Sequence, residues 1–255
     1  MSREILQVSG LSMRFGGLLA VNGVALTVKE KQVVALIGPN GAGKTTVFNC
    51  LTGFYRPSGG TILLDGEPIQ GLAGHQIARK GVVRTFQNVR LFKEMTALEN
   101  LLIAQHRHLN TNFFAGLFKT PGFRRSEKEA MERAQYWLDK VNLTEFANRT
   151  AGTLAYGQQR RLEIARCMMT RPRIIMLDEP AAGLNPKETE DLKALIAYLR
   201  ESHNVTVLLI EHDMKLVMSI SDHIVVINQG TPLAHGTPQE IRDNPEVIKA
   251  YLGEA

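Results

Sequence analysis

The chain has 255 residues, a length that fits one large α/β domain or two small ones. Hydrophobic residues make up 44% and charged residues 22%, which excludes a disordered or fibrous protein. The two cysteines, Cys50 and Cys167, argue against a disulfide-stapled secreted domain and indicate a reducing compartment. A net charge of +5 leaves a nucleic acid or a membrane surface open as a partner.

No apolar run reaches the roughly 20 residues that a membrane-spanning helix needs. Runs such as Ile174–Leu177 and Val205–Ile210 have the length of strands, and Met1–Ile5 lacks the apolar core of a signal peptide. We therefore expect a soluble, cytosolic chain that needs a partner protein for any role at a membrane.

The first third is predicted to hold strands. Val33–Ile37 is continuously apolar, as expected of a strand buried on both faces. Val24–Val28 alternates apolar and small or polar residues as a half-buried strand does, and an Asp-Gly turn follows Thr61–Leu64. The β-like runs beside Val33–Ile37 are Ile5–Val8, Val24–Val28 and Thr61–Leu64. The pattern predicts an antiparallel layer next to a buried, parallel strand.

The middle of the chain is predicted to be helical. Ser126 and Glu129 have the spacing of a capping box and precede a helical pattern that includes Trp137 as a core residue. Gln158–Met169 is a second helix, opened by a glycine. The irregular stretch His106–Phe123 is predicted to be a loop with a short amphipathic segment. Because no strand signal lies between about residues 96 and 170, we expect a helical insert.

The last third alternates between strands and helices. It contains strands at Ile174–Leu177, Val205–Ile210 and Ile224–Ile227, a helix at Glu188–Glu201, and two helices that begin near Thr237 and Asn244. Such alternation predicts a parallel sheet covered by helices.

The strongest motif is Gly38-Pro39-Asn40-Gly41-Ala42-Gly43-Lys44-Thr45, a full match to G-x-x-x-x-G-K-[ST] between a buried strand and a predicted helix. Glycines let backbone N–H groups surround a phosphate, and the helix N-terminus adds positive potential. Lys44 is expected at the β- and γ-phosphates and the Thr45 hydroxyl at Mg²⁺. We expect these residues, together with Thr46, to bind a nucleoside triphosphate.

A second motif, Asp178-Glu179, ends the buried run Ile174–Leu177. Ligands of open α/β sheets bind beyond the carboxyl ends of the strands, so both carboxylates are delivered to the phosphate region. Adjacent side chains of a strand point in different directions and can hold different roles. We expect Asp178 to bind Mg²⁺ and Glu179 to polarise the attacking water.

Further motifs follow in order, and with them the chain resembles the ATP-binding subunits of ABC transporters over essentially its whole length. Leu154-Ala155-Tyr156-Gly157-Gln158 stands where the family's signature belongs, and Ala181–Asn185 resembles the D-loop. The resemblance implies that Phe15 stacks on adenine. It also implies that Gln87 binds Mg²⁺ and water and senses the membrane subunit, and that His212 is the switch histidine.

The resemblance implies an α/β fold, a P-loop NTPase core with a mostly parallel sheet, an N-terminal antiparallel β layer and a helical subdomain insert. The core is expected at residues 1–90 and 171–255 and the insert at 91–170. Two cassettes would enclose two ATP molecules head to tail. Each site would then receive Ala155, Tyr156, Gly157 and Gln158 from the partner. Arg160 and Arg161 follow the signature. We expect them to lie on an exposed face or to form a structural pairing, in preference to contacting the partner's triphosphate.

Departures from the family pattern bear on turnover. Ala155 replaces a serine that would bond the γ-phosphate, Tyr156 replaces a glycine, and Asn185 stands where aspartate is common. These changes raise the alternative of a cassette that does not hydrolyse ATP. Glu179 and His212 are both intact, which favours hydrolysis.

Four strings resemble the branched-chain amino acid importers: Arg84–Phe92, Leu154–Gly157, Glu211–Met214 and Tyr251–Gly253. This implies ATP and Mg²⁺ as cofactors and a peripheral location on the cytoplasmic face of the inner membrane. It also implies transmembrane permease subunits, which would contact Leu91 and Phe92, and indirectly a periplasmic amino-acid-binding protein. A second ATPase subunit is expected, with a heterodimer preferred to a homodimer.

Other functions stay open at this point. An ABC ATPase of nucleic-acid repair or translation suits the basic charge, but the chain has one cassette, no long heptad pattern, no zinc-ligand cysteines and no basic tail. An exporter ATPase is a further alternative. A small GTPase or kinase would leave Leu154–Gln158 unexplained, and the chain lacks Asn-Lys-x-Asp. We expect no nucleic-acid partner.

Overall fold

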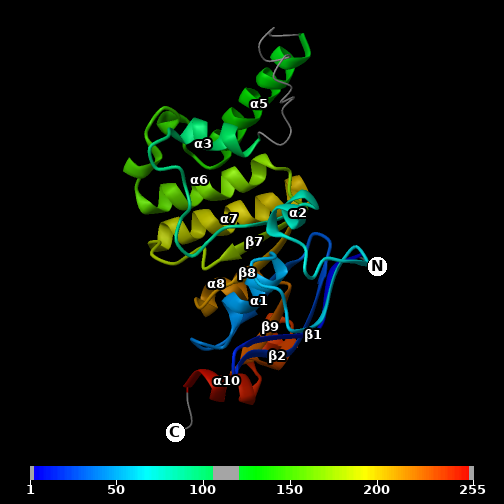
Figure 1. Ribbon diagram of the computed structural model, residues 1–255. Coiled ribbons are helices and arrows are strands. Elements are labelled where there is room, and N and C mark those ends of the chain that lie inside the picture. The colour runs from blue at the N-terminus through cyan, green and yellow to red at the C-terminus, as the bar shows by residue number, and fades with distance from the viewer. Residues whose placement is uncertain (1–2, 106–120, 253–255) are drawn as a thin grey trace. The chain divides into compact units, whose positions relative to one another are not determined.

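The computed structural model describes residues 3–105 and 121–252, and it divides into two compact units (Figure 1). The first unit consists of Met1–Arg84, Arg173–Ala182 and Thr189–Ala255, and the second of Thr85–Pro172 and Gly183–Glu188. Most of the predicted loop His106–Phe123 lies outside the described residues. Within the described ranges, no helix has the length and apolar character needed to cross a membrane.

A four-stranded antiparallel sheet forms one layer of the first unit. Its strands lie in the order β2-β1-β4-β5, with bounds β1 Glu4–Phe15, β2 Leu18–Lys29, β4 Gly59–Leu64 and β5 Glu67–Pro68. β1 and β2 are far longer than predicted. The reason is a register shift on either side of Gly10, whose φ is 63°, because such a bulge breaks the strict alternation from which strands are predicted.

A six-stranded sheet carries the site of the first unit. Its order is β10-β9-β3-β8-β7-β6, with bounds β3 Val33–Ile37, β6 Val82–Arg84, β7 Ile174–Asp178, β8 Thr206–Ile210, β9 His223–Asn228 and β10 Thr231–Gly236. All neighbours are parallel except β9 and β10. Every residue of β3, β7 and β8 is buried, as the continuous apolar runs predict. The predicted mostly parallel sheet with an antiparallel layer is confirmed.

The helices of this unit follow from local signals. They are α1 Lys44–Leu51, α2 Gly74–Arg79, α8 Met214–Ile220, α9 Pro238–Arg242 and α10 Pro245–Leu252, while α7 Pro186–His203 begins in the second unit. α9 begins where predicted and has a capping box, in which Thr237 and Glu240 hydrogen-bond each other's backbone N–H groups. α7 buries a stripe of four aliphatic side chains: Leu192, Leu195, Ile196 and Leu199.

The second unit is helical in its described residues, apart from an isolated bridge between Thr96 and Thr150. It contains α3 Ala97–Ala104, α5 Pro121–Lys140, α6 Tyr156–Met169 and two short 3₁₀ turns, Thr144–Phe146 and Ala151–Thr153. The three α-helices contact one another, and Trp137 of α5 is 1% exposed, in agreement with its predicted place in the core.

The predicted start of α5 is wrong. The helix begins at Pro121, so Phe123 belongs to it and Ser126 lies in its second turn rather than at its cap. The Ser126 hydroxyl donates to the Phe123 carbonyl at 2.8 Å, a bond made along the helix.

Candidate active site

The glycine-rich loop between β3 and α1 is packed tightly against neighbouring backbone. Gly41 and Gly43 have φ of 79° and 93°, values that favour glycine. A Cβ atom at Gly38 would lie 2.0 Å from the Ile227 carbonyl oxygen, and one at Gly43 would lie 2.8 Å from that of Ala20. The loop therefore needs glycine for close approach as well as for its turn.

Lys44 is folded into this loop. Its side chain is almost fully buried, and Nζ donates to the Gly38 and Pro39 carbonyls at 2.7 and 2.9 Å. Burial lowers the pKa of Lys44, while the nearby Glu179 and Asp178 carboxylates oppose that change. The structure thus brings together the cation and both carboxylates that the sequence analysis assigned to one site.

Asp178 ends β7 and forms a buried ion pair with Arg84 at the end of the adjacent β6, with side chains 3% and 5% exposed. Arg84 also donates to Asn49 Oδ1 of α1 at 2.6 Å, and its guanidinium lies over the Phe48 ring. The role of Arg84 was not predicted from the sequence. Its place at the carboxyl end of a strand was the feature of the sequence that could have indicated this role.

Glu179 follows in an unusual backbone conformation, with φ of 48°, in the left-handed region that non-glycine residues rarely adopt. Its carboxylate lies 4.0 Å from His212 Nδ1. Glu211, fully buried, accepts the Ala181 N–H at 2.7 Å and the His212 N–H at 3.0 Å. Glu211 was missed as a positioning residue, because its contacts join segments far apart in the sequence.

Phe15 lies at the end of β1 and is 41% exposed. Tyr55 packs against its edge, with ring centroids 5.2 Å apart and an interplanar angle of 79°. Two half-exposed rings therefore offer an apolar surface suited to a flat, aromatic ligand group. Tyr55 was not identified from the sequence.

In the second unit, the signature residues form the start of α6. Gln158 Oε1 accepts the Ala155 N–H at 3.0 Å. A Cβ atom at Gly157 would lie 2.4 Å from Glu188 Oε1, so a side chain there would displace the Glu188 carboxylate. The helix begins at Tyr156, one residue before the predicted opening at Gly157. Its free N–H groups and dipole make this helix end suited to an anion.

Asn185 directly precedes α7 and caps its first turn. Its Oδ1 accepts the Glu188 N–H at 3.0 Å, while Glu188 Oε2 accepts the Asn185 N–H at 2.9 Å. This reciprocal pair is a helix cap, a position that favours asparagine as much as aspartate. The departure from the family's aspartate therefore leaves the cap intact.

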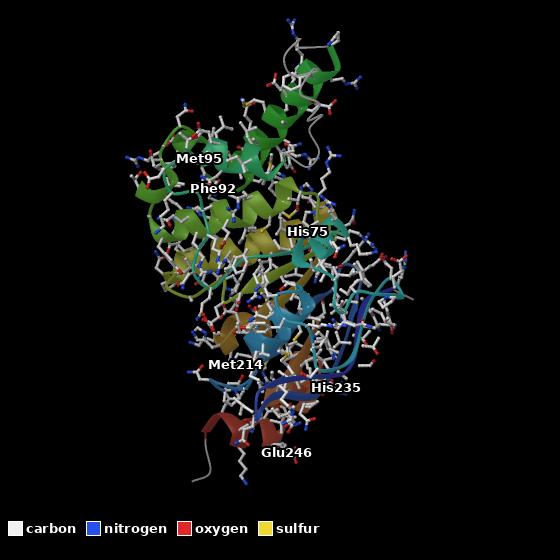
Figure 2. All side chains as sticks on the ribbon, in the orientation of Figure 1. His75, Phe92, Met95, Met214, His235 and Glu246 are labelled. Carbon is white, nitrogen blue, oxygen red and sulfur yellow. The ribbon has the colours of Figure 1, made fainter. Side chains whose placement is uncertain are left out.

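Gln87 lies with its neighbour Asn88 on an exposed segment of the second unit, between β6 and α3. Phe92 and Met95 follow on the same segment (Figure 2), where Phe92 is 49% exposed and Leu91 is partly buried. Asn100 holds this stretch through hydrogen bonds to the Phe92 N–H and carbonyl at 2.9 and 3.0 Å.

The donor set fits Mg²⁺ bound to a nucleotide. Thr45, on the first turn of α1, is exposed and offers a hydroxyl oxygen, and Asp178 offers a carboxylate. The described residues contain no group of three or more His, Cys, Asp or Glu that could hold a metal ion. Mg²⁺ at a triphosphate takes one or two protein ligands and fills its other positions with phosphate oxygens and water, so a hydroxyl and a carboxylate suffice.

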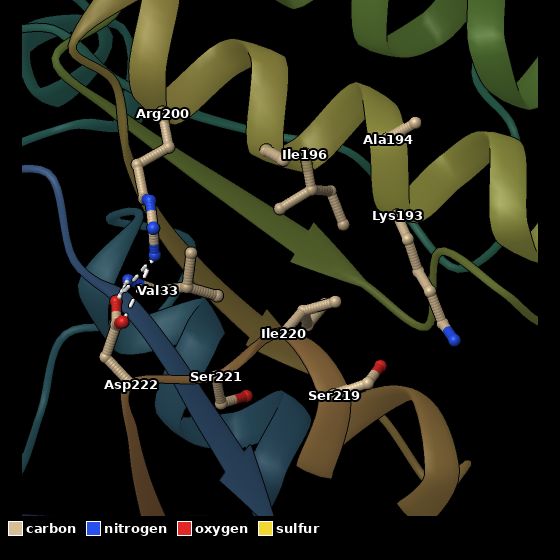
Figure 3. Close-up of a pocket in the computed structure, with 10 residues that line it drawn as sticks. Val33, Lys193, Ala194, Ile196, Arg200, Ser219, Ile220, Ser221 and Asp222 are labelled. Atoms are coloured by element: carbon tan, nitrogen blue, oxygen red, sulfur yellow. Dashed lines mark hydrogen bonds and ion pairs between the residues drawn. The ribbon is translucent and has the colours of Figure 1, made fainter.

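A pocket of about 450 Å³ elsewhere in the first unit is unrelated to these residues (Figure 3). Arg200 and Lys193 of α7 line it, with Ser219 and Asp222. Arg200 donates to both oxygens of Asp222 at 3.1 Å, and Asp222 accepts the Val33 N–H at 2.8 Å. These groups connect the end of α7 to the start of β3, which is a structural role.

Comparisons with known proteins identify the family. The family model for the ABC transporter matches residues 21–182, and that for the branched-chain amino acid ATP-binding cassette transporter matches residues 231–255. The chain is 86% identical over all 255 residues to the high-affinity branched-chain amino acid transport ATP-binding protein BraF of Pseudomonas aeruginosa, and 69% identical to LivG of Escherichia coli K12, each covered in full.

A solved ATP-binding cassette of an ABC transporter, MJ1267 in its ADP conformation, is 33% identical to the chain with a TM-score of 0.85, and the match covers 99% of this chain and all of that one. The predicted fold and the predicted resemblance are both confirmed. The chain belongs to the ABC transporter family, in the group of branched-chain amino acid transport ATP-binding proteins.

Proposed function

We propose that this chain is the ATP-hydrolysing subunit of a branched-chain amino acid importer. The observation that carries the chemistry is the meeting of Lys44, Asp178 and Glu179 at the carboxyl ends of parallel strands. The relatives at 86% and 69% identity are named for transport of branched-chain amino acids, which supports the choice of solute.

Phosphate binding is assigned to the glycine-rich loop and its lysine. The N–H groups of Gly38–Thr46 surround the phosphates, and the Lys44 ammonium moves from the Gly38 and Pro39 carbonyls to phosphate oxygens, which are better partners for a buried cation. Phe15, with Tyr55 against its edge, receives the adenine ring.

Hydrolysis is assigned to Glu179, which orients a water molecule and accepts its proton. His212, 4.0 Å from this carboxylate, holds it in place and contacts the γ-phosphate. Thr45, Asp178 and, as the resemblance implies, Gln87 would hold Mg²⁺, which would neutralise the charge that develops on the phosphates. The Arg84 guanidinium fixes the orientation of Asp178.

A second cassette completes each site. The start of α6, with Ala155, Tyr156, Gly157 and Gln158, faces the γ-phosphate held by the partner chain. We prefer a heterodimer with a related ATPase subunit to a homodimer. The partly buried Leu91 and the exposed Phe92 dock against a transmembrane permease at the cytoplasmic face of the membrane, and an amino-acid-binding protein delivers the solute from the other side.

Two substitutions test the catalytic assignment. We expect Glu179→Gln to keep ATP binding, lose most turnover and accumulate an ATP-bound dimer, because only the proton acceptor is removed. Lys44→Ala should weaken nucleotide binding itself. Glu190→Gln, an exposed carboxylate on α7, is the matched control and should behave as the wild type. Near-normal steady-state hydrolysis by Glu179→Gln would remove that residue from the role of base.

The solute and partners need a different experiment. Purification of the native membrane complex, followed by identification of its subunits, should yield a second ATPase subunit, transmembrane permease subunits and an amino-acid-binding protein. Uptake of labelled leucine by the purified complex in vesicles would then test the direction of transport. A complex without permeases, or one that binds nucleic acid tightly and in a salt-sensitive manner, would overturn the proposal.

A further inference from the structure

Two consecutive carbonyl groups of the Gln87 segment are held by a single buried side chain of α6. Arg160 is 4% exposed and donates through Nη1 to the Phe86 carbonyl at 3.1 Å and through Nη2 to the Gln87 carbonyl at 2.7 Å. The fixed fork of a guanidinium suits such a paired contact. The position of the Gln87 backbone is thus tied to that of α6.

A second anchor lies one turn along the same helix. Glu163 is 1% exposed, and its Oε1 accepts the Arg90 N–H at 3.0 Å. The Arg90 guanidinium folds back over the Phe86 ring, 4.2 Å from its centroid. Residues three apart share one helix face, so Arg160 and Glu163 hold the two ends of segment 86–90 from the same side.

Arg160 also contacts the signature itself. Its Nε and Nη2 donate to the Tyr156 hydroxyl oxygen at 3.0 and 2.7 Å, and its guanidinium lies 5.2 Å from the Tyr156 ring centroid. Tyr156 is the residue that departs from the family's glycine. A glycine would offer no acceptor to this guanidinium, so the departure adds a hydrogen-bonded connection from Tyr156 through Arg160 to the Gln87 carbonyl.

We propose that Tyr156 and Arg160 are positioning residues that link the Gln87 segment to the signature, so that displacement of one moves the other. This inference rests on the proposed function, in which Gln87–Phe92 meets the permease and the signature meets the partner's ATP. The link is stiff because its central cation is buried and its contacts are charge-assisted. Docking of a solute-loaded permease would therefore change the placement of Tyr156 without any new contact to ATP.

The first test uses the full chain alone. Tyr156→Phe removes the hydroxyl acceptor and keeps the ring, and because Tyr156 is 44% exposed the variant should fold normally. We expect hydrogen exchange of the Gln87–Arg90 amides to become about tenfold faster, since loss of a hydrogen bond to a charged group loosens the clamp. Tyr136→Phe, the same change on α5, is the matched control. Unchanged exchange in Tyr156→Phe would overturn the proposal.

The second test uses the complete transporter in vesicles with leucine as the probe. We expect Tyr156→Phe to lower the ratio of leucine-stimulated to basal ATP hydrolysis about tenfold. Arg160→Lys should do the same, because an ammonium cannot reach two carbonyls and a phenol together. The double variant should lose no more than either single variant, and additive losses would overturn the link.

The two tests separate the inference from the proposed function. If leucine does not stimulate hydrolysis by the wild-type complex, the proposed function fails, and the exchange experiment still decides the link. If leucine stimulates the wild type and both variants equally, the proposed function stands and the link is refuted.

Discussion

Replacing Arg84 by methionine isolates the contribution of the buried ion pair behind the phosphate loop. Methionine keeps an unbranched apolar side chain of similar reach, so the packing against Phe48 is largely retained while the charge is lost. Asp178 is then left with its side chain 3% exposed and without its arginine partner. The Arg84 hydrogen bond to Asn49, 2.6 Å long, disappears with it.

The size of the effect follows from burial. Removing one partner of a buried pair costs about 3–5 kcal/mol, because the remaining charge has lost both water and its counter-ion. An exposed pair of the same unit, Lys80 and Glu67, has side chains 38% and 68% exposed and should contribute less than about 1 kcal/mol. In urea, a loss of 3–5 kcal/mol corresponds to a shift of the unfolding midpoint by about 1 M or more.

Urea denaturation followed by circular dichroism measures the unfolding midpoints of Arg84→Met and of Lys80→Ala, in which the exposed pair is broken, under the same conditions. Arg84→Met should show the large shift and Lys80→Ala a small one. The double variant Arg84→Met with Asp178→Asn should be more stable than Arg84→Met alone, since the Asp178 carboxylate that lost its arginine partner is then absent. Equal midpoints for Arg84→Met and Lys80→Ala would refute the reasoning, because the ion pair would then contribute no more than a surface contact.

Two further predictions concern titratable groups. Burial, with the neighbouring His235, lowers the pKa of His223, so the unfolded chain binds more protons than the folded chain and the free energy of unfolding falls as the pH drops below about 6.5. His223→Gln should reduce the loss of unfolding free energy between pH 7.5 and 5.5. An unchanged loss would contradict this. Burial raises the pKa of Cys50 to about 11 and that of Cys167 to about 12. Neither thiol should therefore react with iodoacetamide at pH 8 until the chain is unfolded. Mass spectrometry of the native protein after labelling would detect a modified cysteine, which would contradict this.

The sheet and its site could be predicted from sequence because their signals are local. A strand buried on both faces is a continuous apolar run, and Val33–Ile37, Ile174–Leu177 and Val205–Ile210 all became central strands within a residue at each end. The glycine-rich loop and the Asp178-Glu179 pair are contiguous motifs with fixed offsets from those strands. The boundaries of β1 failed where a bulge at Gly10 interrupts the alternation, because the apolar pattern does not report a bulge.

The contacts that orient the site could not be predicted in the same way. Arg84 lies 94 positions before Asp178, and Arg160 lies 73 positions after Gln87. Pairing of polar groups over such separations depends on which strand ends and helix faces the fold brings together, and no periodicity encodes that. Arg160 was expected either on an exposed face or in a structural pairing. Because Arg160 is buried, the structural pairing is the correct alternative.

The signature variant shows why a departure from a family pattern has to be judged by its neighbours. Set against the family's serine and glycine, Ala155 and Tyr156 indicate only a lost hydroxyl and a weaker contact with the partner's phosphate. Within the fold, the Tyr156 hydroxyl accepts two hydrogen bonds from a cation that also binds the Gln87 carbonyl. The first interpretation predicts that restoring glycine at 156 strengthens ATP-driven closure. The second predicts that it uncouples closure from the solute, and the ratio of stimulated to basal hydrolysis decides between them.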